Sequence, residues 1–241
     1  MKNPVMIFKI GLRQVLRDGM LLILLPAPFL MGAVLRVLVP LADQMLNERM
    51  GFSISPWFSV SDAMVLTMTP VMTAMISAFL ILEERDEGIG TYYNITPASG
   101  YSYLTARIGL PMIWGWTSSI LVISLFSINQ YGWFEIVVAT VIGTLQGVIM
   151  SMFLVAFAAN KVEGLALAKL SNIFVMGFVI PWLIPWPFKY LFGVLPGFWI
   201  GEILKNTNLT ILTISLYGLG GLISCLVFIL LLTKIFLKRI T

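Results

Sequence analysis

Six apolar stretches run through this chain of 241 residues, each about as long as the 20 or so residues that a helix needs to cross a membrane. Hydrophobic residues make up 59% of the chain and charged residues only 11%, whereas soluble domains carry about 25% charged residues. No polar interval is long enough for a separate soluble domain. We therefore expect an all-α integral membrane protein with one transmembrane domain over residues 1–241. The six spans are predicted at 20–40, 62–82, 108–128, 134–158, 165–184 and 211–233.

The first 19 residues carry charge too often to form a span. Lys2, Lys9, Arg13 and Arg17 fall within one sector of a helical wheel, and apolar side chains lie beside them. This pattern predicts an amphipathic helix in the membrane interface, with its basic residues toward anionic headgroups. A simple cytoplasmic tail is the alternative.

Two regions near the predicted spans contain residues that disturb helices. Pro26 and Pro28 predict a kink in the first span. Arg36, near the opposite end of that span, is expected to extend to water rather than contact a substrate. Prolines, glycines and aromatic residues interrupt 185–206, which predicts short re-entrant or interfacial helices before the last span.

The short loop Asn129–Trp133 predicts that the third and fourth spans are antiparallel neighbours. Gly143 and Gly147 in the fourth span predict a close approach by another helix.

The lysines and arginines predict the orientation of the chain. Six spans place both termini on the same side, together with 83–107. Of the 15 basic residues, all but Arg36, Arg49, Lys189 and Lys205 fall on that side. Because cytoplasmic loops are enriched in Lys and Arg, both termini and 83–107 are expected in the cytoplasm.

The sequence lacks the groups that most catalytic sites need. It has no histidine, and its one cysteine, Cys225, lies in an apolar run typical of a structural thiol. It contains no phosphate-binding loop and no zinc-protease or serine-hydrolase motif. The acids within 83–87 are consecutive, with Arg85 among them, unlike a calcium loop. We therefore expect no enzyme activity, and no catalytic, cofactor or metal site or nucleic-acid partner.

No carboxylate pair lies in the middle of a predicted span. An ion-coupled carrier usually holds an ionisable group near the membrane midplane. Uphill transport by this chain would therefore need energy from another subunit, and 83–107 is the predicted entry point.

The polar stretch 83–107 also resembles a known family. Its sequence Glu84-Arg85-Asp86-Glu87-Gly88 is followed by Thr96-Pro97 and then by Ala106-Arg107. This order and spacing resemble a cytoplasmic signature of the type-2 permeases of ATP-binding-cassette (ABC) transporters, and the order of predicted elements extends the resemblance over nearly the whole chain. Ile89 and Gly90 depart from the family pattern, which usually has serine or threonine after the glycine.

The resemblance implies a membrane subunit of a bacterial plasma-membrane exporter. It implies a dimer with a second copy or a sister permease, and two separate ATPase subunits that hold ATP and magnesium. It also implies that a short coupling helix, with acids at its start and Gly88 near its end, docks on the ATPase. The implied interface residues are Glu83, Glu84, Arg85, Asp86, Glu87, Gly88, Pro97 and Arg107.

Methionine and aromatic side chains of the second and third spans are candidates for an adaptable apolar wall. This wall predicts a hydrophobic or amphipathic cargo such as a drug, peptide or lipid, although ordinary helix packing uses the same residues. Two other functions remain open, a non-transporting scaffold or sensor that binds an ATPase-like partner and a self-sufficient secondary carrier. The candidate path residues are Met64, Met68, Met72, Met75, Phe79 and Trp114.

Overall fold

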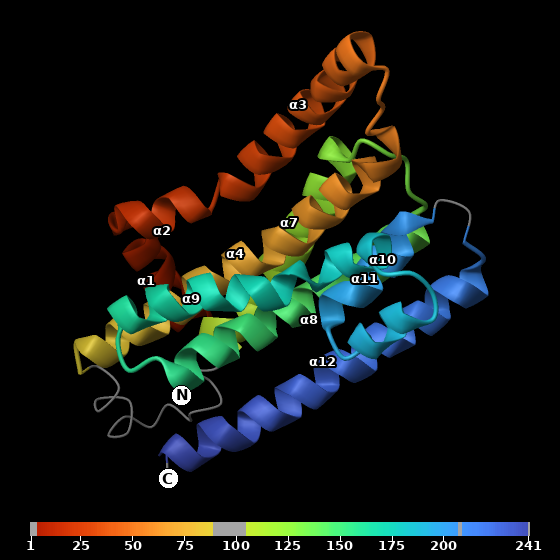
Figure 1. Cartoon of the computed structure of the whole chain (residues 1–241). Coiled ribbons are helices and arrows are strands. Elements are labelled where there is room, and N and C mark those ends of the chain that lie inside the picture. Colours follow the sequence, from red (N-terminus) through yellow and green to blue (C-terminus); the bar gives the residue numbers. More distant parts are fainter. Residues whose placement is uncertain (1–3, 89–104, 207–208, 241) are drawn as a thin grey trace.

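The computed structural model describes residues 4–88, 105–206 and 209–240, and it contains helices and no strands within these ranges (Figure 1). Six helices or helix combinations are long and apolar enough to cross a membrane. The predicted all-α membrane fold is therefore confirmed. In chain order the elements are α1 (Pro4–Arg17), α2 (Gly19–Leu24), α3 (Ala27–Met50), η1 (Ser55–Trp57), α4 (Phe58–Asp86), η2 (Thr105–Gly109), α7 (Leu110–Phe126), α8 (Trp133–Phe157), α9 (Lys161–Val175), η3 (Met176–Val179), α10 (Ile180–Leu183), η4 (Phe188–Phe192), α11 (Pro196–Lys205) and α12 (Ile211–Ile240).

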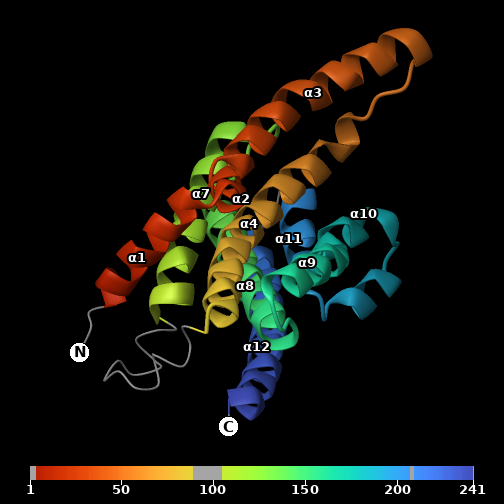
Figure 2. The ribbon, with the colours of Figure 1, turned by 90° about the vertical axis from the view of Figure 1, so that its left-hand side faces the viewer.

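The central element of the bundle is α4. In the span Ser55–Asp86, 89% of the apolar window is buried, against 6% in Ala27–Met50. Figures 1 and 2 show α4 among α3, α7, α8 and α9. The first residues of α1, the last of α12 and the last of α4 lie toward the same end of the bundle, which we call the terminal end.

Small residues bring α7 and α8 close to α4. A Cβ atom on Gly147 of α8 would lie 2.7 Å from the carbonyl oxygen of Pro70 in α4. A Cβ on Gly115 of α7 would lie 2.9 Å from Thr73 Oγ1. The close approach predicted for Gly143 and Gly147 is thus made to α4, and α7 and α8 pack together as the short loop between them predicts.

The first span differs from its prediction. Residues 19–24 form the separate helix α2, and α3 continues to Met50, ten residues beyond the predicted end at 40. Pro26 and Pro28 account for the break between α2 and α3. The polar residues after Pro40 lower the hydropathy, but most of them are compatible with a helix. Gly51, with φ at 64°, then ends α3 in the left-handed conformation.

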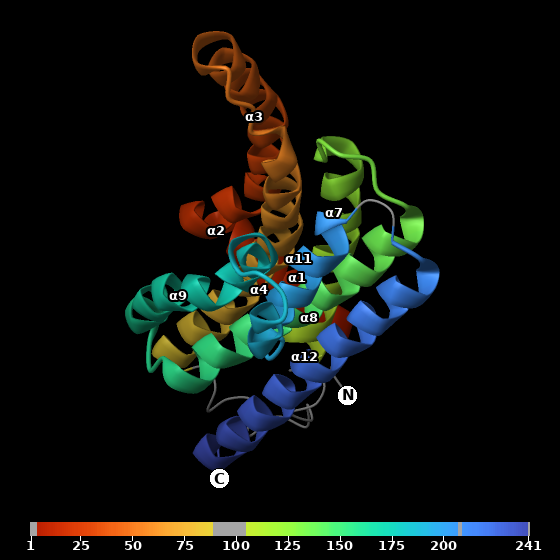
Figure 3. The same ribbon diagram turned by 45° about the vertical axis from the view of Figure 1, so that its right-hand side comes forward.

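The segment before the last helix is interrupted, as its prolines and glycines predict. The described part of 185–206 contains the short helices η4 and α11, and α11 packs against α8 and α12 (Figure 3). Gly201 of α11 faces the carbonyl oxygen of Phe178, so no side chain fits between them. Lys189 Nζ lies 2.6 Å from a carboxylate oxygen of the fully buried Glu202. The fifth span is also segmented, since α9 ends at Val175 and η3 and α10 complete it.

Candidate functional site

A buried ion pair joins the residues that flank the undescribed part of the 83–107 segment. Glu84, in the last turn of α4, is 3% exposed, and Arg107 in η2 is 2% exposed. Their side chains form a salt bridge. Arg107 Nη2 also donates to Gln14 Oε1 of α1 at 3.3 Å, and its guanidinium lies against Gly11. Three elements therefore meet on one arginine.

Arg85 of α4 binds the end of α8. Its Nη1 donates to the carbonyl oxygen of Ala158 at 2.7 Å, and its Nη2 donates to that of Val155 at 3.1 Å. The last carbonyl groups of a helix have no partner within the helix and carry partial negative charge, so a guanidinium stabilises them. Arg85 thus fixes the end of α4 to the end of α8.

Lys161, at the start of α9, joins two acids from distant parts of the chain. Its Nζ lies 2.5 Å from Asp18 Oδ2 and 3.0 Å from Glu83 Oε2. The hydrogen bond from Lys161 holds the pKa of Asp18 below its usual value, although partial burial opposes the shift. The backbone N–H of Lys161 donates to Asp86 Oδ2 at 2.9 Å. These contacts link α2, α4 and α9.

The acidic run lies at a different place in its helix than the sequence predicted. Its first four charged residues lie at the C-terminal end of the long α4, not at the start of a separate short helix. Acids are unfavourable beside the negative end of a helix dipole, and Arg85, Arg107 and Lys161 offset this effect. Gly88 follows the helix with φ at 68°.

The predicted interface residues fall into three groups. Arg85, Asp86, Glu87 and Gly88 are exposed and accessible to a partner, and Glu83 is partly exposed. Glu84 and Arg107 are buried against one another. Pro97 lies outside the described residues, as do Ile89 and Gly90. The docking of an ATPase on this segment stays a prediction.

Three residues that bind the charged side chains near the end of α4 were not predicted from the sequence: Gln14, Asp18 and Lys161. Asp18 carried a usable signal, because an aspartate before an apolar run is a common helix N-cap. It does cap α2, accepting from the backbone N–H of Met20 at 2.8 Å. The contact between Lys161 and Asp18 joins residues 143 positions apart, and no local pattern marks it.

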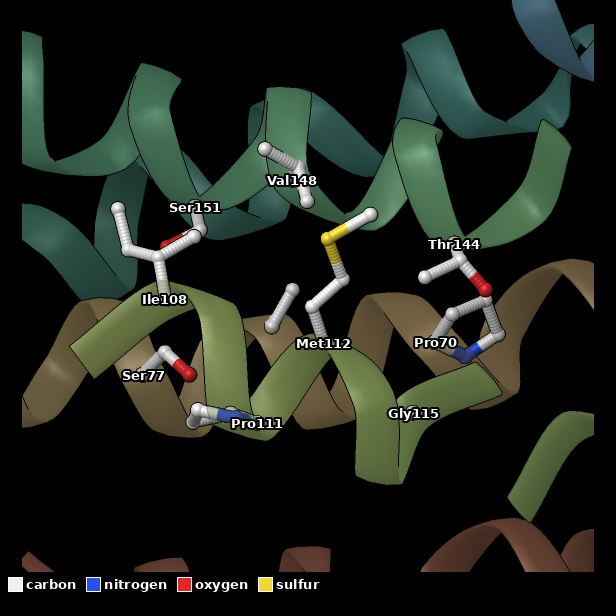
Figure 4. Close-up of a pocket in the computed structure, with 10 residues that line it drawn as sticks. Pro70, Ser77, Ile108, Pro111, Met112, Gly115, Thr144, Val148 and Ser151 are labelled. Atoms are coloured by element: carbon white, nitrogen blue, oxygen red, sulfur yellow. The ribbon is translucent and has the colours of Figure 1, made fainter. Parts of the chain in front are cut away.

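A small cavity lies between α4, α7 and α8 (Figure 4). Its volume is about 10 Å³, room for about one water molecule. Two nearly fully buried serines line it, Ser77 of α4 and Ser151 of α8, and neither hydroxyl has a hydrogen-bond partner among the described residues. The remaining lining residues are Pro70, Ala74, Ile108, Pro111, Met112, Gly115, Thr144 and Val148.

None of the six predicted path residues lines this cavity. Met68 and Phe79 belong to the packed core, and Trp114 is 53% exposed on the outer surface of α7. Met64, Met72 and Met75 are partly buried. A transport path along these residues stays a prediction. Within the described ranges, no group of three or more acidic or cysteine side chains is placed to hold a metal ion.

The six spans and the single buried central helix define a multi-pass membrane protein. A family model described as fluoroquinolones export permease protein Rv2686c-like matches residues 11–233, and the chain belongs to this bacterial family of export permeases. This membership confirms the resemblance to drug-exporting permeases.

Two relatives from Mycobacterium tuberculosis are similar to the chain. They are the fluoroquinolones export permease protein MT2760 of strain CDC 1551 / Oshkosh and the fluoroquinolones export permease protein Rv2686c of strain ATCC 25618 / H37Rv. Each is 27% identical over 194 residues, which cover 79% of this chain and 77% of the relative. No solved structure matches the chain.

Proposed function

We propose that this permease is the membrane subunit of an ABC exporter and uses ATP hydrolysed by a separate ATPase. The observation that carries the proposal is the position of α4. Its exposed end, Arg85–Gly88, belongs to the sequence signature of type-2 permeases, and the rest of the helix is the buried centre of the bundle. A force applied at that end reaches α7 and α8 directly, because both pack on α4.

The clusters around the end of α4 support this role. The Glu84–Arg107 pair holds the two sides of the predicted coupling segment together, and Arg85 ties α4 to α8. A push on the segment therefore moves α4, η2 and α8 as one unit. In this proposal the terminal end faces the cytoplasm, in agreement with the lysine and arginine distribution. ATP and magnesium bind the ATPase, and this chain binds neither.

The proposed cargo is hydrophobic or amphipathic. The names of both mycobacterial relatives specify fluoroquinolones, which makes these drugs the first candidates. The proposed complex contains two permease chains and two ATPase subunits. A scaffold that binds an ATPase without transport, and a secondary carrier, are the competing functions.

Charge reversal of Glu87 tests the docking site. Glu87 is exposed, and its side chain makes no described hydrogen bond or ion pair. Glu87→Lys is therefore expected to leave folding unchanged but to weaken ATPase binding by about tenfold. The lysine replaces a negative charge that the ATPase is proposed to bind with a positive one. The measurement is co-purification and titration of the ATPase with the full permease in lipid nanodiscs.

Glu48→Lys is the matched control, since Glu48 is also an exposed acid in the last turn of α3. The ends of α3 and α4 lie at opposite ends of the bundle (Figure 1). Glu84 is a poorer choice, because its buried pairing makes any loss of docking inseparable from misfolding. Equal ATPase binding by the wild type and the Glu87→Lys variant would argue against this docking site. A permease that captures no ATPase at all would favour the alternative function of a secondary carrier.

A further inference from the structure

The hydroxyl groups of Ser77 and Ser151 differ from those of three other buried serines in the bundle. Ser118, Ser119 and Ser224 each donate to a backbone carbonyl of their own helix, at 2.6–3.0 Å. The Ser77 and Ser151 hydroxyls make no such bond, although the two residues are only 2% and 1% exposed. A buried hydroxyl without a partner is costly, so two of them on one cavity indicate an absent hydrogen-bonding group.

The cavity combines this polar floor with an apolar rim. Ile108 of η2, Pro111 and Met112 of α7 and Val148 of α8 are only partly buried, so the rim reaches the surface of the bundle. In Figure 4 the side chain of Met112 extends from α7 toward α8. A methionine side chain is flexible and polarisable and adapts to varied apolar partners. The rim is therefore suited to an apolar molecule that approaches from the side.

We propose that this cavity binds a small hydrogen-bonding substituent of the exported molecule, and that Ser77 and Ser151 determine its specificity. The inference rests on the proposed function, and it assigns a cargo contact to α4, α7 and α8 within one chain. The cavity volume of about 10 Å³ admits one small polar group, such as a carbonyl oxygen, a hydroxyl or an amine. The apolar remainder of the molecule lies along Met112 and Val148.

The position of the cavity on α4 connects cargo binding to the driven end of the helix. Ser77 lies two turns before Arg85 on the same helix, and Ser151 lies in the last two turns of α8, whose end Arg85 binds. Arg85 joins the ends of the two helices that carry these serines, so a push on that end is transmitted to both sides of the cavity.

The test measures binding of ciprofloxacin, a fluorescent fluoroquinolone, to the full permease in nanodiscs of phosphatidylethanolamine and phosphatidylglycerol. Ser77→Ala and Ser151→Ala are each expected to weaken binding several-fold, and the double variant by about tenfold or more. Ser224→Ala is the control, because the Ser224 hydroxyl is already satisfied by Gly221. Val148→Phe narrows the rim and is expected to weaken binding while leaving the two serines intact.

A water molecule bound in the cavity could also satisfy the hydroxyls of Ser77 and Ser151. The melting temperature of each variant without drug distinguishes a structural water from a cargo site. If the double variant binds ciprofloxacin as the wild type does, or if it only melts earlier with unchanged affinity, the cavity holds a structural water and the inference fails. Wild-type export of ciprofloxacin alongside that result would leave the proposed function standing. A wild type that neither binds nor exports ciprofloxacin would overturn both this inference and the proposed fluoroquinolone cargo.

Discussion

Replacing Arg107 with alanine is expected to destabilise the folded permease by about 3–5 kcal/mol, the usual cost of removing one partner from a buried ion pair. Glu84, which is only 3% exposed, would lose its salt bridge to Arg107. Gln14 would lose its donor at the same time. The measurement is equilibrium unfolding in mixed detergent micelles.

Two further variants test whether the loss of stability in Arg107→Ala comes from the buried ion pair. Arg49→Ala removes an exposed arginine of α3 and is expected to change stability by less than about 0.5 kcal/mol. The double replacement Glu84→Leu with Arg107→Met removes both charges and is expected to recover most of the loss, since apolar residues often replace buried pairs well. An Arg107→Ala variant as stable as Arg49→Ala would show that the pair does not hold η2 on α4.

Replacing Asp62 with alanine is the second large change, with an expected loss on the order of 3 kcal/mol. The Asp62 carboxylate is 1% exposed and accepts four hydrogen bonds from the loop between α7 and α8. Burial and the nearby Asp62 charge raise the pKa of Tyr131 far above its usual value, so the Tyr131 hydroxyl stays a donor. The donors are Ile128 N at 2.7 Å, Asn129 N at 3.1 Å, Asn129 Nδ2 at 3.0 Å and Tyr131 Oη at 2.9 Å.

Asp43→Ala is the matched control for Asp62. Asp43 also binds a loop, accepting from the Ile54 N–H at 2.6 Å and from Ser53 Oγ at 2.9 Å, but it is only partly buried. Water can replace its bonds, so we expect a loss of about 1 kcal/mol or less. Unfolding in the same micelles gives both values. Equal losses of stability in the Asp43→Ala and Asp62→Ala variants would show that burial does not strengthen the contribution of Asp62.

Hydropathy predicted the membrane fold because the cost of exposing polar backbone to lipid restricts spanning segments to helices or closed barrels. It predicted the end of α3 less well. Hydropathy reports which residues suit lipid, and the polar residues between Pro40 and Gly51 continue the helix without suiting lipid. Helix length there depends on local propensity and on the cap at Gly51.

The site was less predictable than the fold. The acidic run beginning at Glu83 was visible in the sequence, but its counter-charges Arg107 and Lys161 come from other elements. The cavity had no sequence signal, because an unpaired serine differs from a paired one only in its three-dimensional surroundings. The methionines of α4 suggested a transport path along one face of that helix. The cavity instead lies beside Ser77 of the same helix, whose hydroxyl is unpaired.

Above all, we propose that this permease exports hydrophobic or amphipathic cargo with energy from a partner ATPase. ATP-driven uptake of ciprofloxacin into inverted membrane vesicles, with and without the co-purifying ATPase, tests it most directly. We expect uptake to need both proteins and ATP, and to continue when a protonophore removes the proton gradient. Uptake by the permease alone, or uptake that collapses with the gradient while ATP is present, would contradict it.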